Sequence, residues 1–480
     1  MNLREDILAI WQAGVDGVAV DRLIRNNVAL SESAGNGAKR NPRAATLCIA
    51  GVAYPLSDIR RIVVIGGGKA SGRMAETLEA ILLGDRELSS RLTGWVNVPD
   101  DCVVPLQKIR LHPSRPMGIN EPTEAAAFGT ERIIELLKSL TPDDLCINLL
   151  AGGGSALLPA PPPEILLAEK LEITRFLSAA GANIEELNTV RKQISLLKGG
   201  QMKKLCRGCR LVSLILSDVL GDPLDVIASG PTVDNPTSAD DAVQVFQKFM
   251  SAPATGPQKV AIQNVVRFLQ QKSETPEKPA TDDGLVRNII IGNNAIAVDC
   301  AATEARRRGY AVVATSAVKS EELADEVGIH LAERALHLAD IPTQGYFALI
   351  SGGEPVVRLA PKEIRGKGGR NQQLVLAALI HLLNNDRLAT SSCAAIAFAS
   401  GGTDGEDGPT NVAGAVFDDE LIGRLHNRML NDPAFDPQRF LDTNDAYSFF
   451  DTLDGLMITG PTGTNVCDLR IVLTGPASYP

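Results

Sequence analysis

Aromatic residues are scarce in this chain. They make up 4% of its 480 residues, whereas hydrophobic residues make up 44% and glycine alone contributes 43 residues. Such a chain must build its cores from aliphatic side chains and turn sharply at glycines, as doubly wound α/β proteins do. Because its length exceeds what one hydrophobic core usually serves, we expect two domains.

Positive charge is also in short supply. The 47 Lys and Arg residues are outnumbered by 57 Asp and Glu residues, for a net charge of -10. No long basic stripe offsets this balance, which disfavours nucleic acid or an anionic membrane as a partner. No apolar run approaches the ~18 residues that span a bilayer, and the first residues lack the apolar core of a signal peptide. We therefore expect a cytoplasmic protein that binds a small molecule, with monomer and homodimer both left open.

Cysteines and histidines are few, eight and five. The one Cys-x-x-Cys pair, Cys206 and Cys209, lacks the further ligands that a metal site of about four ligands needs, and reduced thiols are expected. Ser155 follows three glycines, but the stretch is not a G-x-S-x-G nucleophile elbow. No serine triad can be argued.

The chain contains a recurring local pattern. An apolar run of strand length leads into a turn after residues 62–65, 145–150, 211–216, 288–291, 347–350 and 395–399. Glycines occupy five of these turns, and Ser217-Asp218 follows the run 211–216. Continuously apolar runs predict strands buried on both faces, hence a Rossmann-like α/β fold with a mainly parallel sheet flanked by helices in each domain. Ligands bind at the carboxyl ends of such strands. Taken singly, each cluster can also be a tight turn without a ligand.

The polar, proline-bearing stretch from Gln271 to Gly284 has no apolar periodicity. It predicts a domain boundary, with domains at residues 1–272 and 286–480. A long surface loop within one domain is the alternative.

Lys69 stands where a helix is expected to begin, directly after a glycine cluster. The cluster is neither a P-loop, since Val63 occupies the first glycine position, nor a dinucleotide fingerprint, since Ser71 occupies the third. A cation at a helix N-terminus costs about 0.3–1 kcal/mol, unless a phosphate or carboxylate lies between them. We predict a catalytic role for Lys69; the alternative is a solvent-facing lysine.

Arg370 repeats this pattern. With Arg365 and Lys367 it forms a run of cations among glycines, just before a helix expected from about Gln372 to Leu383. An anionic ligand would relieve both their mutual repulsion and the helix dipole. Arg370 could bind phosphate oxygens through two parallel hydrogen bonds. A flexible basic hairpin is the alternative.

Carboxylates and a basic segment complete the candidate residues. Asp218 and Asp404 follow buried strands, and each could hold magnesium or act as a base, although carboxylates in turns often serve as caps. Asn188, Arg191 and Lys198 suit the carboxylate of a small acid, with a solvated helix face as the alternative. The residues predicted to bind a cofactor are Gly66, Gly67, Gly68, Gly152, Gly153, Gly154, Ser155, Gly353 and Glu354.

In this order, eight stretches resemble the glycerate 2-kinase family, whose C-terminal half is called the MOFRL domain. They are VVIGGGKASGRMA, LLAGGGSALLPAPP, LNTVRKQISLLKGG, LSDVLGDPLDVIASGPTVDNPTS, ISGGEPVV, GKGGRNQQLVLAAL, SGGTDGEDGPTNVAGA and ITGPTGTNVCDLRIVL. They extend from about Ile62 to the C-terminus. The chain departs from the family after His112-Pro113, where Arg115 and its neighbours replace an acidic motif, and at Cys467, where the family has asparagine.

This resemblance implies transfer of phosphate from ATP to D-glycerate, giving 2-phosphoglycerate, with Mg²⁺ or another divalent cation as cofactor. It also implies two α/β domains with the active site in the cleft between them. The family's important lysine falls on Lys69 and its arginine on Arg370. We add Asp218 as a catalytic residue, and Asp218 with Asp404 as metal ligands.

Two other functions are compatible with the pattern. One is an NAD(P)H-dependent hydroxypyruvate or tartronate-semialdehyde reductase, which the missing third glycine disfavours. The other is a non-catalytic sugar-phosphate sensor.

Overall fold

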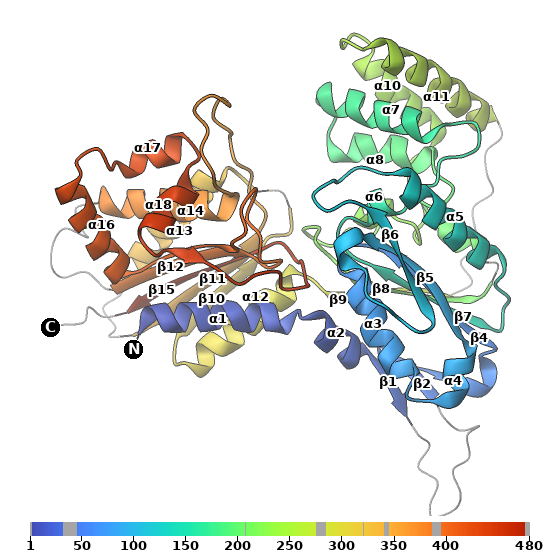
Figure 1. The fold of residues 1–480 in the computed structure, drawn as a ribbon, viewed down its shortest axis with the longest axis horizontal. Helices are drawn as coiled ribbons and strands as arrows, with labels where there is room; N and C mark the ends of the chain where they lie inside the picture. Colours follow the sequence, from blue (N-terminus) through green and yellow to red (C-terminus); the bar gives the residue numbers. More distant parts are fainter. Residues whose placement is uncertain are drawn as a thin grey trace, which may run out of the picture. The chain divides into compact units, whose positions relative to one another are not determined.

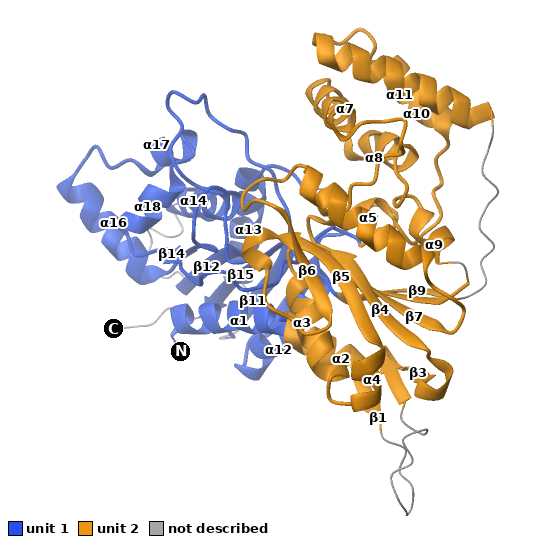
Figure 2. Ribbon diagram, turned by 45° about the vertical axis from the view of Figure 1, so that its right-hand side comes forward, with its two compact units in different colours: residues 1–19, 218–221, 292–480 blue, residues 20–217, 222–291 orange. Residues whose placement is uncertain are grey.

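The computed structural model describes residues 2–31, 46–206, 208–274, 285–319, 321–339, 345–385 and 395–475. The chain divides into two compact units (Figure 2): unit 1 comprises residues 1–19, 218–221 and 292–480, and unit 2 comprises residues 20–217 and 222–291. No helix in these described ranges combines the length and apolarity that a membrane crossing requires.

The sheet of unit 2 has six strands in the order β6-β5-β4-β7-β8-β9. The strands are β4 (Arg61–Gly67), β5 (Leu92–Pro99), β6 (Ile109–Arg115), β7 (Asp144–Leu150), β8 (Arg210–Leu216) and β9 (Val286–Gly292). The pairs from β6 to β8 are all parallel, which confirms the predicted parallel sheet. The strand order reverses between β4 and β7, and such a switch point is where ligands bind in open α/β sheets.

Helices cover this sheet, and a separate helical layer stands at one end of the unit (Figure 1). The unit's helices are α2 (Val20–Asn27), α3 (Ser71–Leu82), α4 (Arg86–Arg91), α5 (Glu124–Lys138), α6 (Gly154–Leu157), α7 (Leu167–Ala179), α8 (Ile184–Gln193), α9 (Gln201–Leu205), α10 (Ala239–Phe249) and α11 (Gly256–Glu274). Helices α7, α8, α10 and α11 share a hydrophobic cluster around Phe176 and Phe246. A small antiparallel sheet contains β1 (Val28–Ser31), β2 (Thr46–Ile49) and β3 (Val52–Pro55).

The sheet of unit 1 has the order β10-β11-β15-β12-β13-β14. Its strands are β10 (Ala311–Ser316), β11 (Phe347–Gly353), β12 (Ala395–Gly402), β13 (Gly414–Phe417), β14 (Leu456–Met457) and β15 (Asp468–Gly475). The α/β class is confirmed, but the pairing corrects the prediction: β10 and β11 are parallel, whereas β15 lies antiparallel between β11 and β12, and β13 is antiparallel to both its neighbours. An apolar run indicates a buried strand without indicating its direction.

Helices pack on both faces of this sheet. They are α1 (Leu3–Gly17), α12 (Asn294–Arg307), α13 (Ala324–Ala339), α14 (Arg370–Leu383), α16 (Asp419–Asn431), α17 (Pro437–Asp442) and α18 (Ala446–Thr452). Helices α1 and α12 share one apolar cluster with the sheet, around Trp11. Helices α13, α14, α16 and α18 share another, around Phe398 and Phe417.

The units differ from the predicted boundaries, 1–272 and 286–480, at three places, one of which is the short segment 218–221 that belongs to unit 1. Helix α1 belongs to unit 1 because its buried face, including Ile7 and Ile10, packs in the cluster of that unit. Strand β9 forms the edge of the unit 2 sheet. The first residues of the predicted linker end helix α11, and residues 275–284 lie outside the described residues.

Candidate active site

The glycine turns after β4 and β7 meet at the switch point of unit 2. A Cβ on Gly66 would overlap the carbonyl oxygen of Leu149, and one on Gly68 would lie 2.7 Å from that of Ala151. The backbone of one turn therefore contacts that of the other too closely for any side chain. Lys69 is exposed, its amide donates to Gly152 O at 2.9 Å, and α3 begins two residues later.

Arg115, at the carboxyl end of β6, lies beside the second glycine turn. A Cβ on Gly153 would be 2.9 Å from Arg115 Nη2. The Arg115 side chain is buried, donates through Nη1 to Asn120 Oδ1 at 2.5 Å, and leaves Nε without a hydrogen-bond partner among the described residues. Burial lowers the pKa of this guanidinium. Sequence reasoning did not select Arg115, although its position is where the chain departs from the family.

A hydrogen-bond chain joins three of the predicted residues in unit 2. Lys198 Nζ donates to Ser155 O at 2.7 Å and to Ser155 Oγ at 2.5 Å. Ser155 Oγ lies 3.2 Å from Ser229 Oγ, which donates to Asn188 Oδ1 at 3.2 Å. Ser229 adopts a positive φ of 62° without being glycine, a strained conformation that functional sites often contain. Asn188, Ser155 and Lys198 thus belong to one hydrogen-bonded cluster.

Arg191 lies on α8, the helix that also carries Asn188. Its guanidinium is partly buried and burial lowers its pKa. The pKa of Lys198 is lowered further, first by burial and then by the positive charges of Lys170 and Arg191. The structure therefore brings together the predicted substrate-binding residues and adds Lys170, which the sequence did not indicate.

In unit 1, Arg370 is the first residue of α14, two positions before the predicted start. Its Nε and Nη2 donate to Asp468 Oδ2 and Oδ1 at 2.7 and 3.0 Å, and its Nη1 donates to Glu354 Oε1 at 2.8 Å. Burial opposes the charged form, but the carboxylates of Asp468 and Glu354 outweigh it and raise the pKa of Arg370. The guanidinium is thus held by two carboxylates from the ends of β15 and β11.

The other cations of this basic stretch also have partners within unit 1. Lys367 Nζ lies 4.0 Å from the centre of the Tyr447 ring, and Arg365 donates to Ala360 O through Nε and Nη2. An external anion is therefore not needed to compensate this run of charges. Of these three cations, Arg370 lines the pocket described next.

This pocket has a volume of about 590 Å³ and is lined by Arg370, Glu354, Gly369, Asp404 and Asp407, among others. Asp404 Oδ1 accepts a hydrogen bond from the amide of Glu406 at 3.2 Å, as in an Asx turn. Asp407 is buried and accepts from the amides of Asn371 and Gln372, so it caps α14. Burial, against these hydrogen bonds, raises the pKa of Asp407 to about 6.

The remaining predicted residues have different surroundings. Asp218 does not line this pocket; its carbonyl accepts from Cys467 Sγ at 3.0 Å. A Cβ on Gly353 would overlap Glu321, which pairs with the buried Arg470. In the described ranges, no group of three or more His, Cys, Asp or Glu residues could hold a metal ion. Of the two predicted metal ligands, Asp404 lines the pocket and Asp218 does not.

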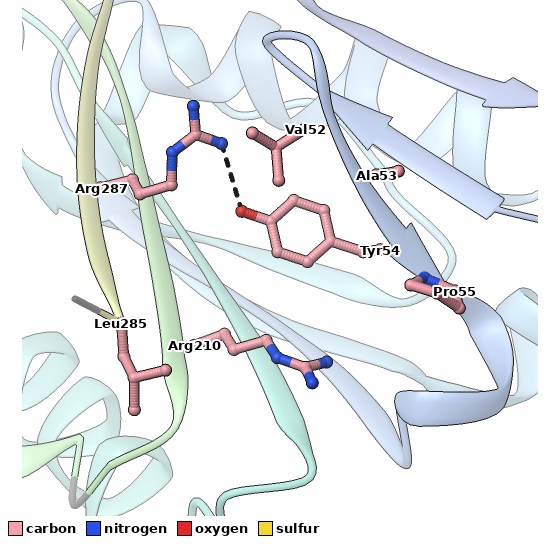
Figure 3. Close-up of a pocket in the computed structure, with 7 residues that line it drawn as sticks. All are labelled: Val52, Ala53, Tyr54, Pro55, Arg210, Leu285 and Arg287. Atoms are coloured by element: carbon pink, nitrogen blue, oxygen red, sulfur yellow. Dashed lines mark hydrogen bonds between the residues drawn. The ribbon is translucent and has the colours of Figure 1, made fainter. Parts of the chain in front are cut away.

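A smaller pocket of about 280 Å³ lies elsewhere in unit 2 (Figure 3). Its wall includes Tyr54 and Arg287, whose Nη1 donates to the tyrosine Oη at 3.4 Å. Arg210, the first residue of β8, also lines it. Because it lies at the amino ends of β8 and β9, it occupies the edge opposite the glycine turns and contains none of the predicted site residues.

Comparison with known proteins gives two family matches. The domain of unknown function DUF4147 matches residues 6–263, and the MOFRL family matches residues 347–468.

Relatives match most of the chain. Glycerate kinase from Danio rerio is 34% identical, covering 98% of this chain and 97% of the relative. D-glycerate 2-kinase from Thermotoga maritima is 33% identical, and the match covers 87% of this chain and 92% of the relative. A putative hydroxypyruvate reductase from Agrobacterium vitis is 36% identical, covering 86% of this chain and all of the relative.

A solved structure shares the fold over nearly the whole chain. The crystal structure of glycerate kinase from Thermotoga maritima has a TM-score of 0.78 and 30% identity, and it covers 98% of this chain and 99% of its own. These matches span both units. The chain therefore belongs to the glycerate kinase family that combines a DUF4147 domain with a C-terminal MOFRL domain.

Proposed function

We propose that this protein is a glycerate 2-kinase, which transfers the γ-phosphoryl group of ATP to the C2 hydroxyl of D-glycerate. The observation that supports the proposal is a basic cluster in unit 2, where Lys198 Nζ donates to Ser155, directly after the second glycine turn, and experiences the positive charge of Arg191. It suits a small carboxylic acid, because cations and hydrogen-bond donors lie together there.

The charge of the reactants assigns roles to the other residues. ATP and glycerate are both anions, so positive groups must first offset their repulsion and then stabilise charge that spreads over the transferred phosphoryl group. Lys69 would supply such charge in unit 2 and Arg370 in unit 1. The turn amides of Gly66–Gly68 and Gly152–Ser155 would donate to anionic oxygens, and Gly353 and Glu354 would border the nucleotide.

A divalent cation is part of this proposal. Mg²⁺ in phosphoryl-transfer enzymes neutralises negative charge on the phosphates. Asp404, on the wall of the Arg370 pocket, is the better placed of the two predicted ligands. Asp218, whose carbonyl accepts from Cys467, stays a proposed ligand or base. We place the enzyme in the cytoplasm.

The reductase remains a second candidate because of the relative from Agrobacterium vitis that carries that name. Ser71, at the third glycine position, is buried and donates through Oγ to Leu149 O at 3.1 Å. This side chain fills the space that a dinucleotide turn leaves open for close packing, which disfavours the reductase. A decrease in nicotinamide absorbance with NADH and hydroxypyruvate would favour it, whereas ADP formed with ATP, Mg²⁺ and D-glycerate supports the kinase. A phosphate sensor would neither oxidise NADH nor form ADP.

A further inference from the structure

Lys170, on helix α7, is a buried lysine. Its side chain is 3% exposed, and its Nζ has no hydrogen-bond partner among the described residues. A buried ammonium that lacks both a hydrogen bond and a counter-charge is strongly disfavoured. The sequence shows only a lysine on an amphipathic helix, which is ordinarily a surface residue.

The neighbouring charge that acts on Lys170 is also positive. Arg191, from α8, lowers the pKa of Lys170, which burial and this charge together bring to about 8. Lys198 experiences the charges of both Lys170 and Arg191.

Nearby groups on the packed helices are occupied elsewhere. Lys192 on α8 pairs with Asp225 at 3.1 Å, and Glu169 on α7 accepts from Asn264 of α11 at 3.0 Å. Lys272, also on α11, donates to Gln193 O at 3.0 Å. None of these contacts supplies a carboxylate to Lys170, Arg191 or Lys198.

We propose that Lys170, Arg191 and Lys198 form the binding site of one small oxyanion, a carboxylate or a phosphate group, which binds together with a proton. In the part of the chain that the structure describes, no carboxylate pairs with these three basic groups, so an anion would neutralise a positive site. The identity of the anion as the carboxylate of glycerate rests on the proposed function, but the existence of the site does not.

The number of hydrogen bonds at each lysine explains why a proton binds together with the anion. Lys198 Nζ has two acceptors, Ser155 O and Oγ, which match the two N–H groups of a neutral amine, whereas an ammonium has three. Lys170 has none. A bound anion supplies both an acceptor and an opposite charge, so it favours the protonated lysines. Binding above the pKa of Lys170 must then draw protons from solution.

Titration calorimetry of the full chain tests this directly. D-glycerate, inorganic phosphate and uncharged glycerol are titrated at about pH 8.5 in two buffers with different heats of ionisation. We expect on the order of one proton taken up per bound anion, and no binding of glycerol. Proton uptake on binding of glycerate alone identifies a carboxylate site, and proton uptake on binding of phosphate identifies a phosphoryl site. Binding of both anions without proton uptake, or binding of neither, overturns the proposal.

A variant and its control test whether Lys170 is the group that takes up the proton. Lys170→Met keeps the length and removes the buried charge, and it should weaken anion binding about tenfold and abolish most of the proton uptake. Lys203→Met is the control, because the Lys203 side chain is partly buried but pairs with Asp234 at 3.5 Å; this variant should change neither the affinity for the anion nor the proton uptake. Thermal unfolding checks that both variants fold, and the measurement on the unmodified chain stands without them.

Unchanged affinity and proton uptake in Lys170→Met would contradict the assignment. Kinase activity is measured separately. If the chain binds phosphate with uptake of a proton but forms no ADP, the proposed function is wrong and the anion-binding site is still supported.

Discussion

Arg370 and Asp468 form a two-point ion pair in which Nε and Nη2 donate to Oδ2 and Oδ1 at 2.7 and 3.0 Å. Asp468 begins β15 and lies in register with Gly353 of β11 and Gly402 of β12. Both neighbouring strands end in glycine there, so the carboxylate of the central strand is flanked by bare backbone. This arrangement fixes the guanidinium at the edge of the pocket.

Arg370→Ala should lower both stability and turnover. Asp468 is fully buried. Among the described residues, its carboxylate would keep the side-chain amide of Asn371 as a donor, so we expect a loss of about 3 kcal/mol in the free energy of unfolding. Urea unfolding measures this loss. Asp468→Asn provides the matched comparison, because it removes the same ion pair while keeping the arginine. Equal stability of Arg370→Ala and the unmodified chain would contradict the pairing.

Lys69→Ala should lower kcat/KM about 100-fold without changing the unfolding midpoint, because the side chain is exposed and supplies charge rather than packing. Steady-state kinetics with ATP and D-glycerate measures the effect. Lys138→Ala, which removes an exposed lysine from the last turn of α5, is the control and should behave like the unmodified enzyme. Near-normal turnover of Lys69→Ala would remove Lys69 from the catalytic residues.

Ser155→Ala should reduce kcat only about tenfold, because we assign the hydroxyl to the hydrogen-bond chain with Lys198 and Ser229 rather than to a covalent intermediate. Rapid-mix kinetics and a search for phosphorylated serine check this. Complete loss of activity, with a phosphoserine in the unmodified enzyme, would make Ser155 a nucleophile instead.

Asp407 should make the protein less stable as pH rises from about 4 to about 6. Burial raises the pKa of this carboxyl to about 6 in the folded chain, above the value near 3.9 expected when unfolded. Between these values the folded state binds more protons, so stability falls with rising pH, by up to about 3 kcal/mol in total. Unfolding by urea at several pH values should show this slope in the unmodified chain and a smaller one in Asp407→Asn. If the stability of Asp407→Asn changed with pH as steeply as that of the unmodified chain, the raised pKa of Asp407 would be wrong.

The sequence predicts the strand ends of this site better than its interior. Glycine clusters after apolar runs located the turns around Lys69 and Ser155 and the start of the helix at Arg370, since each signal lies within a few neighbouring residues. Asp468 was not selected because its role depends on β15 pairing between two strands distant in the chain.

Buried cations were missed for a related reason. Lys170 and Arg115 look like surface residues in sequence, because helical or strand periodicity does not show which side chains other elements cover. Their burial follows from the packing of α7 in its helical layer and of β6 beside the second glycine turn. Contacts between distant segments decide both cases.

The central claim is that phosphate passes from ATP to the C2 hydroxyl of D-glycerate. The direct measurement is to incubate the protein with ATP, Mg²⁺ and D-glycerate and to identify the product by phosphorus NMR. The account predicts 2-phosphoglycerate and an equal amount of ADP, neither of which forms when a chelator removes the metal. Formation of 3-phosphoglycerate, or of no phosphoglycerate while NADH reduces hydroxypyruvate, would contradict it.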